Sequence, residues 1–209
     1  MNCNRCSLAL SHLESITAIP MSRTDRNDRE VLILDRAAVH DAMERARIQF
    51  SDLVGRATPA DLRRRSNGTR WTNRQLLFHM MFGYLVVRTL MPLVHAFGKR
   101  PASWSRRFAA TLNAGQRPFH LINYIGSCGG GQVLPTSTMI GLMDRTIHAL
   151  QRKLAAETNE NLALTMHFPT AWDPYFHDTM SVFDVYHYGT QHFDHHHKQL
   201  TLSDPPAAI

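Results

Sequence analysis

Apolar residues recur at steps of three and four in separate stretches of the chain, which is the pattern of amphipathic helices. The first stretch predicts a helix over residues 36–55 that stops near Gly55, with apolar positions at Val39, Met43, Ala46, Phe50 and Leu53. Thr58-Pro-Ala-Asp-Leu62 then starts a short turn, and Ser66-Asn-Gly68 breaks it.

A second, more apolar helix is predicted to open at Trp71-Thr-Asn-Arg-Gln75. Thr72 and Gln75, three residues apart, form a capping box that satisfies free amide groups at a helix start. One face of this helix then carries Leu76, His79, Met80, Gly83 and Val87, so that His79 lies within the apolar stripe.

The second half of the chain adds two more long helices. Residues 101–125 predict one or two short helices, and Gly126-Ser-Cys-Gly-Gly-Gly131 predicts a flexible loop that fits neither the P-loop nor the dinucleotide fingerprint. A third long helix follows, marked by Met139, Met143, Ile147, Leu150 and Leu154, and a last helix is expected over about 179–200, before Pro205-Pro206. The pattern therefore predicts an all-α four-helix bundle with additional short helices in its connections.

One segment, Leu76–Phe97, is apolar enough and long enough to suggest a membrane span. It contains His79, Arg88 and His95, and Pro92 is expected to interrupt it. An arginine within a span costs about 2.5–3.5 kcal/mol on insertion scales. We therefore predict the central helix of a soluble bundle and no membrane partner.

Composition agrees with one soluble globular domain, since hydrophobic residues make up 44 % and charged residues 19 % of the 209 residues. The net charge of +6 is unevenly distributed, with +9 in residues 1–109, the basic half, and −3 in residues 110–209. The arginines of the basic half are scattered and are not interleaved with exposed aromatic residues. We expect solvated helix faces and no nucleic-acid partner.

Three cysteines, Cys3, Cys6 and Cys128, do not suffice for a disulfide framework and indicate a reducing, cytoplasmic setting. The first residues do not resemble a secretion signal, and Met21 is a candidate start. We expect a poorly ordered N-terminal extension over 1–32, the helical bundle over 33–202 and a C-terminal tail over 203–209.

The most informative stretch is His192-Phe-Asp-His195-His196-His197-Lys-Gln199-Leu200. On a helix, His192 and His196 are four residues apart and share one face, so that their rings can bind one ion. In a bundle, His79 of the second helix can meet them, since facing helices build metal sites from inward side chains.

Together these motifs resemble the DinB-like superfamily of bacterial metal-binding four-helix proteins. The matching pieces are Trp71-Thr-Asn-Arg-Gln-Leu-Leu-Phe-His79 and His192-Phe-Asp-His195-His196 followed by Gln199-Leu200. The resemblance implies a divalent metal ion, zinc or nickel, held by His79, His192 and His196. It also implies that the protein can form a homodimer.

The resemblance implies a fold more firmly than a reaction. Some relatives are thiol transferases that use a low-molecular-weight thiol such as mycothiol or bacillithiol, and others are metal-dependent hydrolases. We therefore expect a metal-dependent enzyme, a thiol-dependent transferase or a hydrolase, that acts on a small-molecule substrate. The alternative is a non-catalytic stress-response protein that binds a metal or a small molecule.

The neighbours of the predicted ligands leave several alternatives open. His195 can replace His196 as a ligand, His197 is expected to be exposed, and His187 is either a partner of a ligand or a surface residue. Asp184 or Asp194 either accepts a proton from a ligating imidazole or lies on the helix surface. Gly83 either opens room for a substrate or permits close helix packing.

Overall fold

The structure, a computed structural model, describes residues 23–203, which form eight helices and two short strands. The elements are α1 (Arg23–Arg56), α2 (Pro59–Arg63), α3 (Asn73–Gly98), α4 (Ala102–Ala114), α5 (Gln116–Val133), α6 (Thr136–Ala156), α7 (Asn159–Leu162), β1 (Thr165–His167), β2 (Thr179–Ser181) and α8 (Val182–His197). The predictions for Cys3, Cys6, Met21 and Pro205-Pro206 lie outside the described residues.

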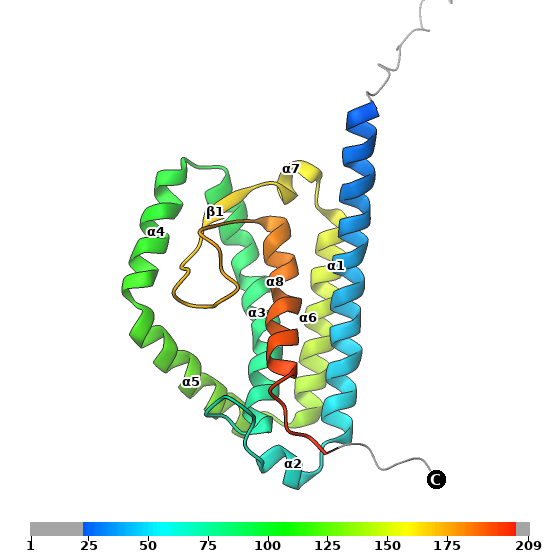
Figure 1. Ribbon diagram of the computed structural model, residues 1–209, viewed down its shortest axis with the longest axis vertical. Coiled ribbons are helices and arrows are strands. Elements are labelled where there is room, and N and C mark those ends of the chain that lie inside the picture. Colours follow the sequence, from blue (N-terminus) through cyan, green and yellow to red (C-terminus); the bar gives the residue numbers. More distant parts are fainter. Residues whose placement is uncertain (1–22, 204–209) are drawn as a thin grey trace, which may run out of the picture.

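Four long helices form the bundle, and the prediction of an all-α fold is confirmed. Helix α1 contacts α6 and α8, and α3 contacts the same two helices from the opposite side, so that the ring runs α1, α6, α3, α8. In Figure 1, α3 and α6 run upwards, whereas α1 and α8 run downwards. Each of the pairs α3–α8 and α1–α6 is therefore antiparallel.

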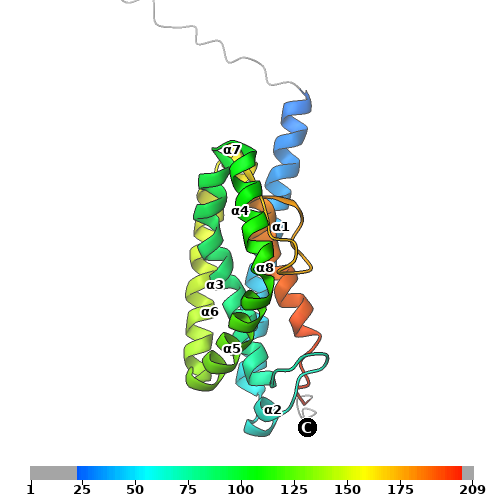
Figure 2. The ribbon, with the colours of Figure 1, turned by 90° about the vertical axis from the view of Figure 1, so that its left-hand side faces the viewer.

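Because α3 and α6 run in the same direction, the chain must return along the length of the bundle after α3 ends and before α6 begins. Helices α4 and α5 make this return and form an arch beside the bundle, in front of α3 in Figure 2. The lower part of the arch packs against α3 through α5, and its upper part contacts β1 through α4. The loop between β1 and β2 lies between the arch and α8 (Figure 1).

The core is built from the predicted apolar faces. All five positions marked on the first helix are buried, as are the five on the third long helix, Met139, Met143, Ile147, Leu150 and Leu154. Helix α1 begins at Arg23 rather than at residue 36, and it ends at Arg56, next to the predicted stop.

Helix α3 is the central helix, and the capping box between Thr72 and Gln75 is confirmed. By length and composition alone α3 could cross a membrane, yet half of its most apolar window is buried inside the protein. The helix also continues through Pro92, contrary to the expected interruption. Met91 and Val94 on either side are fully buried, and their packing offsets the backbone hydrogen bond that proline removes.

The prediction of a flexible glycine loop over 126–131 is wrong, because these residues lie inside α5. Two of the glycines are required for packing rather than for flexibility. A Cβ atom on Gly131 would lie 2.7 Å from the Gln75 Cα atom, and one on Gly130 would overlap the Phe78 ring. The Arg74 guanidinium donates to the carbonyl oxygens of Gly131 and Leu134, which satisfies free groups at the C-terminal end of α5.

The start of the last helix also differs from the prediction. Residues 179–181 form β2, which pairs antiparallel with β1, and α8 begins at Val182. Ser181 and Asp184 form a capping box at this point, so the helix cannot be extended backwards without losing it.

We predict that Gly131→Ala lowers the free energy of unfolding by about 1–3 kcal/mol, because the added methyl group meets α3 backbone that cannot move aside. Chemical denaturation measures the change. Gly129→Ala is the matched control, since a Cβ atom there meets nothing within 4 Å. It should raise stability by up to about 1 kcal/mol through helix propensity. Equal effects of the two substitutions would contradict this account of the packing.

Candidate metal centre

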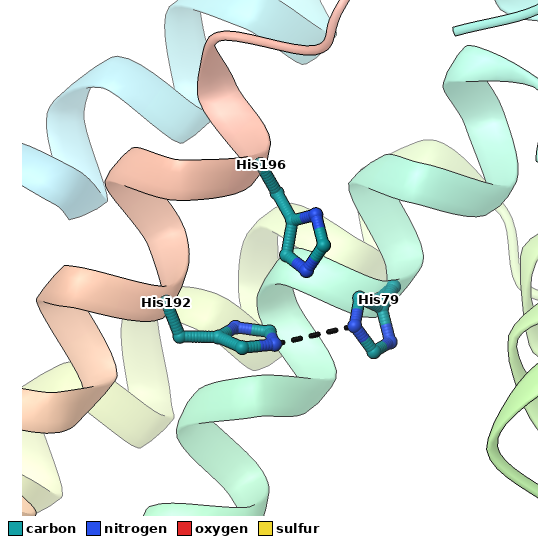
Figure 3. A group of neighbouring side chains, drawn as sticks. All are labelled: His79, His192 and His196. Carbon is teal, nitrogen blue, oxygen red and sulfur yellow. Dashed lines mark hydrogen bonds between the residues drawn. The ribbon is translucent and has the colours of Figure 1, made fainter. Parts of the chain in front are cut away.

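Three histidine rings from two antiparallel helices converge between α3 and α8. His79 comes from α3, and His192 and His196 come from α8 (Figure 3). Each histidine offers one ring nitrogen, and these three nitrogens all lie within 4.8 Å of one another. The Nε2 atoms of His79 and His192 are 3.2 Å apart. Two nitrogens that bind one tetrahedral ion at about 2.0–2.1 Å are about 3.3–3.4 Å from each other. The spacing therefore suits a shared cation.

Local sequence positions the ring of His79. The capping box at Thr72 fixes the start of α3, and His79 follows two turns later on the face towards α8. The ring of Trp71, which directly precedes the cap, lies 4.5 Å from the His79 ring between centroids. The motif from Trp71 to His79 thus fixes both the helix start and the position of one candidate ligand.

Hydrogen bonds on the far side of two rings select the nitrogen that faces the centre. His79 Nδ1 lies 3.1 Å from Ser127 Oγ, and His196 Nδ1 lies 2.7 Å from Gln199 Oε1. The amide oxygen of Gln199 only accepts, so it receives the Nδ1 proton of a neutral His196. Nε2 then presents its lone pair to the centre, as a metal ligand must.

His192 is positioned differently, by a glycine. A Cβ atom on Gly83 would lie 2.5 Å from His192 Nδ1, so only glycine leaves room for this ring. The Nδ1 atom itself is buried and has no hydrogen-bond partner. Gly83 therefore permits close helix packing against a candidate ligand, and because it also lines the cavity described below, the expectation that it opens room for a substrate stays a prediction.

Burial keeps the three rings in the neutral form that binds metals. It lowers the pKa of His79 to about 3, with the His196 ring adding to the effect. Burial also holds the pKa of His192 well below its usual value, and the neighbouring rings of His79, His196 and His195 lower it further. The pKa of His196 is lowered by burial as well, against an opposing hydrogen bond to Gln199. Neutral imidazoles do not repel a cation, and the donor set fits a divalent ion.

Comparison with known proteins agrees with this geometry. The model of the DinB superfamily matches residues 42–200, which is most of the chain and includes both histidine motifs. The chain belongs to the DinB superfamily. Searches of the curated proteins and of the solved structures gave no significant match.

Among the described residues of this DinB protein, the carboxylate nearest to the three candidate ligands is that of Asp173, which neither sequence motif indicated. Asp173, in the loop between β1 and β2, places its Oδ2 atom 3.9 Å from His192 Nε2. The same oxygen accepts a hydrogen bond of 2.9 Å from the Tyr188 hydroxyl, and Oδ1 accepts one from the Tyr175 amide. Asp173 is 19 residues ahead of His192 along the chain, outside either motif, so only the tertiary fold reveals it.

The acidic residues beside the motif have surface roles instead. Asp184 caps α8, and Asp194 forms an ion pair with Arg45 at 3.0 Å. Of the two alternatives left open for these residues, the helix surface is the one observed.

Of the other histidines of α8, His195 borders the cluster of three, with its ring 4.9 Å from the His196 ring between centroids, but it is not one of the three converging ligands. His195 is half-buried, with its Nδ1 atom 3.2 Å from the Tyr175 hydroxyl. His197 is partly buried rather than exposed, and its ring stacks on Phe193. His187 is exposed. The register of α8 therefore brings His192 and His196 to His79.

A cavity of about 510 Å³ adjoins the histidines. His79 and His192 line one part of it, together with Ser127 and Asp173. Most of the remaining wall is aromatic or aliphatic and comes from α3, the arch and the β1–β2 loop. A ligand in this cavity would reach the candidate metal centre directly.

We predict that Ser127→Ala weakens zinc binding by about 10–100-fold, because the hydroxyl that orients the His79 ring is lost. Isothermal titration calorimetry measures the affinity. Ser105→Ala is the matched control, since Ser105 is equally buried on the arch but bonds to backbone groups of Ala102 and His167. Unchanged affinity in Ser127→Ala would show that this contact does not orient a ligand.

We also predict that the metal-free protein loses stability as the pH falls from about 6.5 towards 3. In this window the unfolded chain binds more protons than the folded chain, because the pKa of His79 is about 3 when folded and 6.5 when unfolded. Each such group costs up to about 1.4 kcal/mol for each pH unit. Thermal melting should show a smaller loss in His79→Gln, while His187→Gln, at an exposed position, keeps the original slope.

Proposed function

We propose that this protein is a metal-dependent enzyme that transfers a low-molecular-weight thiol or hydrolyses its substrate. His79, His192 and His196 hold the divalent ion in this proposal. The observation that carries it is the convergence of three ligand nitrogens, all within 4.8 Å of one another, beside a cavity large enough for a small molecule.

The donor set favours zinc or nickel as the ion, since imidazole nitrogens suit both metals. Three neutral ligands leave the charge of the ion uncompensated, so the ion would polarise a bound group and lower the pKa of a water molecule or a thiol. Both thiol transfer and hydrolysis use this chemistry.

The residues of the chain itself supply the other functions of the site. Asp173 Oδ2 lies 3.9 Å from His192 Nε2, close enough to the candidate metal centre to accept the proton that a water molecule or thiol would release there. The Tyr188 hydroxyl donates to the same oxygen and holds the carboxylate in place. The mostly apolar wall of the cavity would limit the access of bulk water to the reacting groups.

The proposal includes a cytoplasmic location and a small-molecule substrate, without a nucleic-acid or membrane partner. Homodimer formation stays a prediction. The rival function is non-catalytic binding of a metal or small molecule in a stress response, and the cavity would serve such a protein equally well.

A turnover screen tests the proposal. The zinc-loaded and nickel-loaded protein is incubated with pairs of a thiol and an aryl or alkyl electrophile, and with nitrophenyl esters. We expect turnover that is abolished in His192→Ala and lowered about 10²–10⁴-fold in Asp173→Asn. His187→Ala, an exposed histidine on the same helix, is the matched control and should keep full activity.

One outcome would count against the enzyme, and another against the role of Asp173. If no pair reacts while metal removal lowers the melting temperature sharply, the ion has a structural role. If Asp173→Asn is as active as the unchanged protein, the carboxylate is not a proton acceptor.

A further inference from the structure

The cavity beside the histidines is mostly apolar. Its walls include Phe82, Leu90, Leu93, Phe108, Phe119 and Trp172, and among the residues that the structure describes neither lysine nor arginine lines it. The acidic or basic groups that do line it are His79, His192 and Asp173, with the Tyr188 phenol beside them. Hydrogen bonds and close contacts place these polar groups together, next to the candidate metal centre.

The cavity is elongated along α3. His79 and Leu93, both in its wall, are separated by 14 residues of one helix. At 1.5 Å for each residue this distance is about 21 Å. Polar groups therefore mark one end, and the far end is lined by aliphatic and aromatic side chains.

The outer wall comes from elements that the four-helix bundle does not need. The β1–β2 loop is attached to the α4–α5 junction by three hydrogen bonds, of which the Trp172 indole donates one to the Leu112 carbonyl at 2.8 Å. The Trp172 ring also stacks on Phe119 at 3.8 Å between centroids. Phe82 and Ile122 line the cavity but remain 38 % and 70 % exposed, which places an entrance between α3 and α5.

Three arginines of the basic half, Arg64, Arg70 and Arg74, have partners outside the cavity. Arg74 bonds to the end of α5, Arg70 lies over the Tyr124 ring, and Arg64 donates to the Thr201 carbonyl. An anionic ligand in the cavity would face the Asp173 carboxylate without a compensating cation from a lysine or arginine, and a charge without a partner is costly in an apolar site.

We infer that this cavity binds an uncharged, elongated, largely apolar organic molecule, with its reacting group at the His79 and His192 end. Binding of such a molecule follows from the cavity alone. Its role as the substrate rests on the proposed function.

The test uses two fluorescent probes that share a ring skeleton. N-phenyl-1-naphthylamine is uncharged, and 8-anilino-1-naphthalenesulfonate adds one negative charge. With the metal-free full-length chain at pH 7.5, we expect the uncharged probe to bind at least tenfold more tightly than the sulfonate. Metal-free protein is used because an ion could attract the sulfonate by itself.

Two glycines of α5 supply a matched pair of variants. Gly126 lines the cavity and Gly129 does not, and a Cβ atom on either meets nothing within 4 Å. Gly126→Phe should weaken binding of the uncharged probe at least tenfold, whereas Gly129→Phe leaves it unchanged. If Gly126→Phe does not fold, Ile122→Trp at the entrance replaces it, with the exposed Leu121→Trp as its control.

Each outcome separates this inference from the proposed function. Equal binding of the two probes, or equal effects of Gly126→Phe and Gly129→Phe, would overturn the inference even if the enzyme proves active. Selective binding that Gly126→Phe abolishes would support it even if no turnover is found. In an active enzyme, the same variant should also raise KM for an apolar substrate at least tenfold.

Discussion

Helices α3 and α8 approach each other closely, and without this contact the histidine cluster could not form. Each helix contributes a glycine that faces a large ring of the other. Gly83 on α3 lies against His192, and Gly189 on α8 lies so near Tyr84 that a Cβ atom would come within 2.8 Å of that ring. The Tyr84 hydroxyl and the Thr190 hydroxyl, 2.9 Å apart, add a buried hydrogen bond to the same contact. Because both glycines allow the helix backbones to approach, imidazoles from two distant segments can share one cation.

The direction of the helices explains the cavity. Parallel α3 and α6 force the chain to cross back, and the arch of α4 and α5 that makes this return leaves a space beside α3 that a short turn would not create (Figure 1). The arch also carries Ser127, which orients the His79 ring. The same connection thus provides one wall of the cavity and one support of the candidate metal centre, so a change in the arch is expected to affect both.

Much of the fold was predictable because its signals are local. Residues within a single helix specify the apolar faces of α1, α3 and α6 and the capping box at Thr72, and the structure confirms these predictions. The glycine segment 126–131 was not, since glycine favours loops in general and only the proximity of Gln75 and Phe78 explains why Gly130 and Gly131 are needed in a helix. The start of α8 was missed for a similar reason, because three residues of strand are fixed by pairing with β1 rather than by their own sequence.

The candidate ligands can be read from the sequence alone, because histidines four residues apart on a helix share a face and the motif at Trp71 belongs to the same family pattern. The groups that surround these ligands can be identified only in the folded protein. Asp173, Ser127 and Gln199 lie on a loop, on the arch and after α8, and their distances to the rings depend on packing across the whole bundle. Hydrogen-bond partners and cavity walls are set by segments distant in sequence, whereas helix periodicity and ligand spacing are properties of a single segment.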